Sequence, residues 1–230
     1  HPLHGEMACA AMDEAWLELE GENLRVSGRY EYVMGFGHHY QAHPAVVMRK
    51  ASALFDIQMA VTNLASVAMP LQYMCHMNYA YVPEATFSQN IPDEALSLRE
   101  SVPAHVQPTE SWLAFNQRLL QGEASLTTLC EPQYYDPEIV FFADKLDRYT
   151  DSPEFRMIAP DGTTFVTRFS STEFNYVTRW ILYNGDQQVA AFALPATCRP
   201  EGFLAAQRNG SLISLAPQQT RSFTVTTGIA

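Results

Sequence analysis

The sequence predicts an all-β protein whose antiparallel strands follow one another as a meander, with one short helix. Apolar and polar residues alternate over runs of strand length, clusters of Gly, Asn, Asp and Pro separate these runs, and a single stretch has helical spacing. A chain of 230 residues can bury a substantial core. We therefore expect one domain over residues 1–230.

The first predicted strands surround the polar turn Gly21-Glu22-Asn23. Trp16–Glu20 precedes this turn and Leu24–Met34 follows it. Residues 53–64 form the next predicted strand, because alternation places four apolar residues on one of its faces: Phe55, Ile57, Met59 and Val61.

The second half repeats this pattern around stronger turn signals. Residues 155–158 and 163–169 flank Ala159-Pro160-Asp161-Gly162, and residues 176–182 run toward Asn184-Gly185. Residues 211–215 follow Asn209-Gly210, and a last strand begins after Thr220. These turns predict that consecutive strands are antiparallel neighbours.

The predicted helix spans Ser111–Gln121. Its apolar residues recur at helical spacing, Ser111 is available as N-cap and Gly122 as a stop. The preceding residues, 91–109, carry Pro92, Pro103 and Pro108, and we expect a long loop there.

Composition restricts the possible partners. The formal net charge is −11 and only 14 residues are Lys or Arg, which argues against a nucleic acid or an anionic membrane as partner. No apolar run approaches the roughly 18 residues of a membrane span. The four cysteines lie far apart without a C-x-x-C pair, so we expect a reduced, cytoplasmic protein.

Two histidines stand in segments that suit sugar chemistry. His4 lies in His-Pro-Leu-His-Gly at the start of the chain, and His76 lies in Met-Pro-Leu-Gln-Tyr-Met-Cys-His-Met-Asn at 69–78. Neutral imidazoles can exchange protons near pH 7 and can hydrogen-bond an uncharged polyol. A sugar is therefore the expected ligand.

The order of the motifs resembles one protein family. L-H-G at 3–5, V-T-N at 61–63, M-P-L at 69–71 and His76 occur in the order found in the aldose 1-epimerase (galactose mutarotase-like) family. Thr178-Arg179-Trp180, residues 193–198 and Pro200-Glu201-Gly202 agree with its uncharacterised bacterial branch. The resemblance covers almost the whole chain.

This resemblance implies a large antiparallel β-sandwich, the galactose mutarotase-like supersandwich. Relatives have several strands ahead of L-H-G, so we expect the chain to be N-terminally incomplete with respect to that fold. The implied activity is an aldose 1-epimerase, a mutarotase that interconverts α and β anomers by acid/base ring opening, without metal or cofactor. The implied partner is a small-molecule sugar, and a homodimer is left open.

The resemblance also implies roles for individual residues. His76 matches the general acid, and His4 matches a second histidine that hydrogen-bonds the sugar. The base of the family is a glutamate in a Leu-Glu-Pro-like triplet, but here the triplet is Ala193-Leu194-Pro195, and leucine cannot accept a proton. Glu201 is our first substitute for the base, and Glu138, where relatives place an acidic sugar ligand, is the second.

The loss of this glutamate supports a different function on the same fold, a sugar-binding protein without catalysis. A lyase or hydrolase is disfavoured, since we find no second carboxylate to pair with the first and no Tyr/Arg acid-base set. Both candidate glutamates could equally be solvated loop residues.

Other side chains could complete a sugar site. Trp180 could stack on the sugar and Asn78 could hydrogen-bond a hydroxyl, while Tyr79 and Tyr81 could line the pocket. Aromatic residues on strands are, however, more often part of the core.

The segment Gly37–His43 raises the question of a metal. His39 and His43 are four residues apart, a spacing that places two ligands together only in a helix, and no third ligand has a convincing spacing. We predict a polar loop here and no metal.

Overall fold

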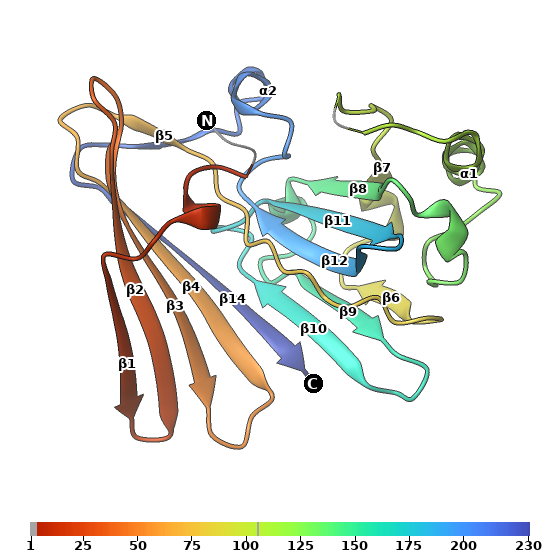
Figure 1. Ribbon diagram of the computed structural model, residues 1–230, viewed down its shortest axis with the longest axis horizontal. Helices are drawn as coiled ribbons and strands as arrows, with labels where there is room; N and C mark the ends of the chain where they lie inside the picture. Colours follow the sequence, from red (N-terminus) through yellow and green to blue (C-terminus); the bar gives the residue numbers. More distant parts are fainter. Residues whose placement is uncertain (1–3, 105) are drawn as a thin grey trace. The chain divides into compact units, whose positions relative to one another are not determined.

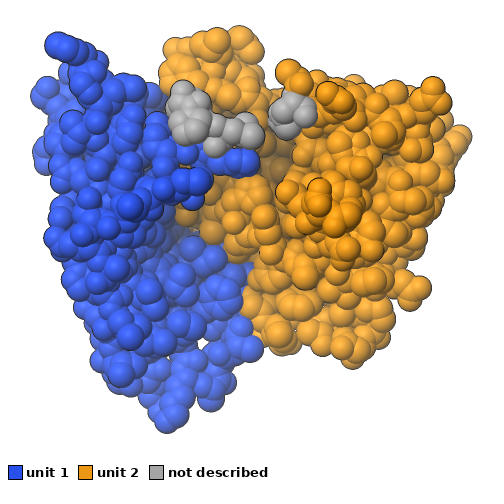
Figure 2. All heavy atoms as spheres, in the orientation of Figure 1, with its two compact units in different colours: residues 1–71, 213–227 blue, residues 72–212, 228–230 orange. Residues whose placement is uncertain are grey.

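The computed structural model describes residues 4–104 and 106–230, and the chain forms two compact units (Figure 2). Unit 1 comprises residues 1–71 and 213–227, and unit 2 comprises residues 72–212 and 228–230. The strands are antiparallel in every pair that has a defined residue register. This confirms the predicted all-β class. The assignment of residues 1–230 to one domain stays a prediction.

Unit 1 contains a row of five strands (Figure 1). Their order is β1 (Glu14–Glu20), β2 (Asn23–Val33), β3 (His39–Arg49), β4 (Leu54–Asn63) and β14 (Thr220–Ile229). β5 (Met69–Leu71) and β13 (Ile213–Leu215) pair separately, and a 3-10 turn, η1, covers Met7–Cys9. The predicted first hairpin is confirmed, since Glu20 pairs with Asn23 across the turn.

Strand β4 shows why unit 1 has one apolar face. Met59 and Val61 are buried, as the alternation predicts. Asn63, at the end of the V-T-N motif, is fully buried and donates from Nδ2 to the carbonyl oxygens of Val67 (2.8 Å) and Leu215 (2.9 Å). Its side chain therefore ties the end of β4 to β13 and satisfies the buried backbone carbonyl of Leu215.

Unit 2 contains two sheets. One has the order β12 (Gln188–Ala196), β11 (Tyr176–Tyr183), β8 (Ile139–Asp144) and β7 (Ser97–Leu98). The strands of the other are, in order, β10 (Thr164–Phe169), β9 (Glu154–Ile158) and β6 (Thr86–Gln89) (Figure 1). Phe87 of β6 lies under the guanidinium of Arg179 of β11, and Tyr79 contacts both Phe165 and Phe192, so the two layers pack as a sandwich.

The helices differ in part from the prediction. α1 spans Glu110–Leu120, and its cap is Thr109, whose hydroxyl accepts from the Trp112 amide at 3.2 Å, so the prediction of Ser111 as N-cap is wrong. A second helix, α2 (Phe203–Arg208), was not predicted, because six residues are too few to show a period of 3.6. The predicted loop 91–109 includes the 3-10 turn η2 (Asp93–Ala95) and β7; two further turns are η3 (Pro132–Tyr134) and η4 (Leu146–Arg148).

The cap of α1 gives a first testable prediction. Thr109→Ala removes the side-chain acceptor for the Trp112 amide and should lower the free energy of unfolding by about 1 kcal/mol, measured by urea denaturation. Gln117→Ala, at an exposed position of the same helix, is the control and should cost less than about 0.5 kcal/mol. An equal loss in both variants would contradict the assignment of the cap.

In the part of the chain that the structure describes, no helix has the length and apolar character needed to cross a membrane.

Candidate functional site

Residues 72–81 run beside β12 as an additional extended segment. Backbone hydrogen bonds join the two at both ends of the segment: Thr197 N to Tyr73 O, Cys75 N to Pro195 O, Ala190 N to Tyr79 O, and Tyr81 N to Gln188 O, at 2.9–3.0 Å. Between the bonds of Cys75 and Tyr79, the segment has three residues, 76–78. Between the partners of these bonds, Pro195 and Ala190, β12 has four residues, 191–194. The segment cannot keep a regular ladder over this stretch.

The irregular stretch exposes His76. His76 and Asn78 are exposed while Cys75, just before them, is buried. Burial raises the pKa of the Cys75 thiol to about 12, so this cysteine stays protonated and is a poor nucleophile at neutral pH. The imidazole is the side chain of this segment that is suited to proton exchange.

His76 lies against Trp180 of β11. Their ring centroids are 5.8 Å apart, with 66° between the planes, an edge-to-face arrangement. The indole Nε1 of Trp180 donates to Oε2 of Glu138 at 2.6 Å. Three residues that the sequence singled out separately, His76, Trp180 and Glu138, therefore form one group in unit 2.

Glu138 is held from several sides. Its Oε1 accepts from Nη2 of Arg99 at 2.7 Å, and both side chains are only 12% exposed. Its backbone carbonyl accepts from the indole Nε1 of Trp112, on α1, at 2.8 Å. The Arg99 charge balances the carboxylate, so Glu138 fixes the orientation of the Trp180 ring and is poorly suited to act as a base.

Leu194 occupies the same face of the sheet as Trp180. It pairs with Thr178 of β11, and cross-strand partners share a face, as do residues two apart such as Thr178 and Trp180. Leu194 is 1% exposed. The position at which the resemblance would place a base is therefore a buried apolar side chain.

A β-bulge next to Leu194 is stabilised by Arg179. Thr178 pairs with Leu194 but Trp180 pairs with Ala191, so Phe192 is one of two residues opposite Arg179. The buried Arg179 donates from Nε to the Phe192 carbonyl at 3.1 Å. Burial lowers the pKa of Arg179 to about 10, which leaves it charged at neutral pH. No motif in the sequence indicates this role of Arg179.

Glu201 lies in a different place, at the Tyr176 end of β11. It lines a cavity of about 310 Å³ together with seven other residues: Asp144, Lys145, Tyr176, Arg199, Ala206, Asn209 and Ser211. Tyr176 precedes Trp180 by four residues, or about 13 Å at the rise of a strand. The structure does not bring Glu201 into the His76 group, and its catalytic role stays a prediction.

Comparisons with known proteins place the fold. No family model matches the sequence, and no curated protein matches it. A proposed aldose 1-epimerase from Klebsiella pneumoniae superposes with a TM-score of 0.72 at 15% identity, over 94% of this chain and 53% of that protein. Galactose mutarotase-like proteins from Clostridium acetobutylicum and Lactobacillus casei give TM-scores of 0.61 and 0.60 at 16% and 11% identity, over 94% of this chain and 65% and 73% of theirs.

The chain has a galactose mutarotase-like fold. This confirms the fold expected from the order of the motifs. The mutarotase-like chain spans about half the length of the Klebsiella protein. At these identities the likeness concerns the fold, and the activity depends on the residues of the site.

His4 belongs to unit 1 of the mutarotase-like chain. The motif L-H-G begins at Leu3, which lies outside the described residues. His4 is exposed and has φ 68°, and Gly5 follows with φ 75°, so the backbone turns here through two left-handed residues. The role of His4 as a sugar ligand stays a prediction.

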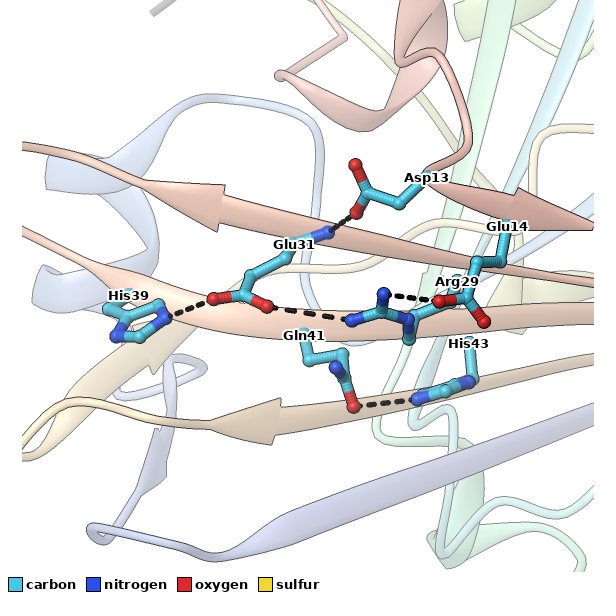
Figure 3. Close-up of polar contacts among 7 residues, drawn as sticks. All are labelled: Asp13, Glu14, Arg29, Glu31, His39, Gln41 and His43. Carbon is cyan, nitrogen blue, oxygen red and sulfur yellow. Dashed lines mark hydrogen bonds and ion pairs between the residues drawn. The ribbon is translucent and has the colours of Figure 1, made fainter.

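His39 and His43 lie on strand β3, so the predicted polar loop is wrong (Figure 3). His39 Nε2 contacts Oε1 of Glu31 at 2.8 Å, and His43 Nε2 contacts Oε1 of Gln41 at 2.7 Å. Four residues of a strand span about 13 Å, too far for both imidazoles to bind one ion. Among residues 4–104 and 106–230, no three His, Cys, Asp or Glu side chains are grouped so that they could hold a metal.

Proposed function

We propose that this chain binds a neutral sugar at the group formed by His76, Asn78 and Trp180. The observation that carries the proposal is the exposed His76 imidazole against Trp180, whose indole is fixed by Glu138. Aromatic faces stack on the C–H faces of sugars, and imidazole and amide groups exchange hydrogen bonds with hydroxyls. A ring already fixed in position loses little freedom when a ligand binds.

The geometry favours binding without efficient catalysis. Ring opening needs a base within about 2.6–3.2 Å of the anomeric hydroxyl oxygen, or one water away. Leu194 is apolar, both carboxylate oxygens of Glu138 are already hydrogen-bonded, to Arg99 and to Trp180, and Glu201 lies at the Tyr176 end of β11. We infer a sugar-binding protein on a mutarotase-like fold.

An aldose 1-epimerase is the second candidate, favoured by the exposure of His76. In this function His76 protonates the ring oxygen, and a carboxylate, for which Glu201 is the candidate, acts as the base. It requires a sugar placed so that a carboxylate reaches its anomeric hydroxyl. Glu201→Gln should then abolish anomer exchange while sparing binding, as followed by saturation-transfer NMR.

Binding at His76 is tested with a sugar identified by ligand-observed NMR. We expect His76→Ala to weaken binding about five- to tenfold, the effect of one lost hydrogen bond of about 1 kcal/mol together with lost ring contact. His43→Ala is the matched control, because His43 lies in unit 1 and contacts Gln41. Equal affinities of the wild type and the His76→Ala variant, with both folded by circular dichroism, would contradict the proposed site.

Anomer exchange separates the two candidates in the same samples. Exchange above the buffer rate that falls about 10²-fold or more in His76→Ala would establish the epimerase. Binding without exchange would establish the sugar-binding function.

A further inference from the structure

One face of β11 continues from the His76 group to the cavity at Tyr176. Tyr176, Thr178 and Trp180 alternate along the strand and so point to the same side. Their direct partners on β8 are Asp144, Phe142 and Val140, in the same order, and share that face. The cavity and the Trp180 ring therefore lie on the same side of β11, about 13 Å apart along the strand, and the Thr178 and Phe142 side chains between them are buried.

The cavity is suited to a neutral polyol. Lys145 and Glu201 both line the cavity, and the Glu201 charge acts on the Arg199 guanidinium. Asp144 and Arg199 add one charge of each sign, so the four formal charges cancel. A hydroxyl can donate to a carboxylate and accept from an ammonium or amide group, whereas an ion of either sign would meet a like charge.

Neutral donors complete the lining of the cavity. Burial, and the Asp144 charge to a smaller extent, raise the pKa of Tyr176, so its phenol keeps its proton. Asn209 and Ser211 add an amide and a hydroxyl. A volume of about 310 Å³ is at the lower limit for a small-molecule site, which suits one sugar ring.

Arg199 bridges the interval between the cavity and Trp180. Asp144 accepts from it in bidentate fashion, with Nε to Oδ1 and Nη2 to Oδ2 both at 2.8 Å. Its guanidinium lies 4.8 Å over the ring of Phe142, whose partner Thr178 is midway between Tyr176 and Trp180. The Arg199 side chain is 32% exposed. Its planar guanidinium, held in place by Asp144, therefore offers further N–H donors between the cavity and Trp180.

We infer that this cavity is a second sugar-binding subsite, and that the ligand is a neutral oligosaccharide extending from the His76 group over Arg199 into the cavity. The inference rests on the proposed sugar binding at His76. It names the substrate class, because a single ring at Trp180 cannot reach Lys145, Glu201 and Asn209.

The experiment uses isothermal titration calorimetry to compare the affinities of sugars with different numbers of rings. The probes are glucose and galactose and their neutral β- and α-linked oligomers of two to four rings. We expect the affinity of the wild type to rise about tenfold or more from one ring to three or four. Lys145→Ala and Asn209→Ala should bring this ratio close to one, whereas Lys50→Ala, an exposed lysine of unit 1, should preserve it.

The outcomes separate this inference from the proposed function. An affinity that does not depend on the number of sugar rings would overturn the oligosaccharide inference while leaving binding at His76 intact. The same holds if the ratio of oligosaccharide to monosaccharide affinity is unchanged in both Lys145→Ala and Asn209→Ala. Binding that is lost in Lys145→Ala and Asn209→Ala but unchanged in His76→Ala would overturn both the proposed site at His76 and the oligosaccharide that spans the two sites, and would leave the cavity as a separate sugar site. A wild-type chain that binds no member of the panel would overturn both.

Discussion

Glu138→Ala is expected to lower the free energy of unfolding by about 3–5 kcal/mol, the cost of breaking a buried ion pair from one side. Arg99 would keep a charge in a nearly buried position without its carboxylate, and the Trp180 indole N–H would lose its acceptor. Urea denaturation followed by circular dichroism measures this loss. Because Trp180 would no longer be held against His76, sugar affinity should fall in the same variant.

The control is a glutamate in a weaker pair. Glu131 contacts Arg118 at 3.5 Å, and these side chains are 28% and 40% exposed. Glu131→Ala should therefore cost at most about 1 kcal/mol. A loss of similar size in Glu131→Ala and Glu138→Ala would show that Glu138 does not anchor the site.

Much of the strand order could be predicted from sequence because local turn chemistry determines it. Gly162 closes the turn between β9 and β10 with φ 89°, and its amide donates to the Ala159 carbonyl at 2.9 Å. This geometry is encoded within four residues. Strand β3 (His39–Arg49) was not predicted, because the polar side chains of its first half, such as His39, which contacts Glu31, lack the alternation of a half-buried strand.

The candidate site could be predicted only residue by residue. His76, Trp180 and Glu138 were each identified from local motifs, but their grouping depends on the pairing of β8 with β11. Arg99 and Trp112 escaped prediction, because one lies in a proline-rich stretch and the other occupies an ordinary core position of a helix. The sequence carries no sign that both contact Glu138.

Leu194→Glu has the largest expected effect on stability. Burial can raise the pKa of a carboxyl group by about 3–5 units, which amounts to about 4–7 kcal/mol once the pH exceeds the raised pKa; at pH 7 the penalty is limited to about 3–4 kcal/mol, because pH 7 lies only about 2.7 units above the unfolded pKa. With a folded-state pKa above the unfolded value of about 4.3, the unfolded chain releases this proton first. The penalty for ionisation is therefore absent below about pH 4 and grows as the pH rises toward the raised pKa.

Denaturation of this variant between pH 4 and 8 measures that dependence, and Leu194→Gln is the matched control. The glutamine has a similar size and polarity but no charge, so its cost should not vary with pH in this way. A loss of stability in Leu194→Glu that does not depend on pH would show that the new carboxyl group reaches solvent.

The same variant tests whether a carboxylate at position 194 lies close to the His76 imidazole. A carboxylate near a protonated imidazole is stabilised, so its pKa would rise less and the variant would lose less stability near neutral pH. Anomer exchange would then appear in Leu194→Glu but not in Leu194→Gln, measured by saturation transfer on the bound sugar. A folded Leu194→Glu variant without exchange would show that restoring a carboxylate at this position is not sufficient for anomer exchange.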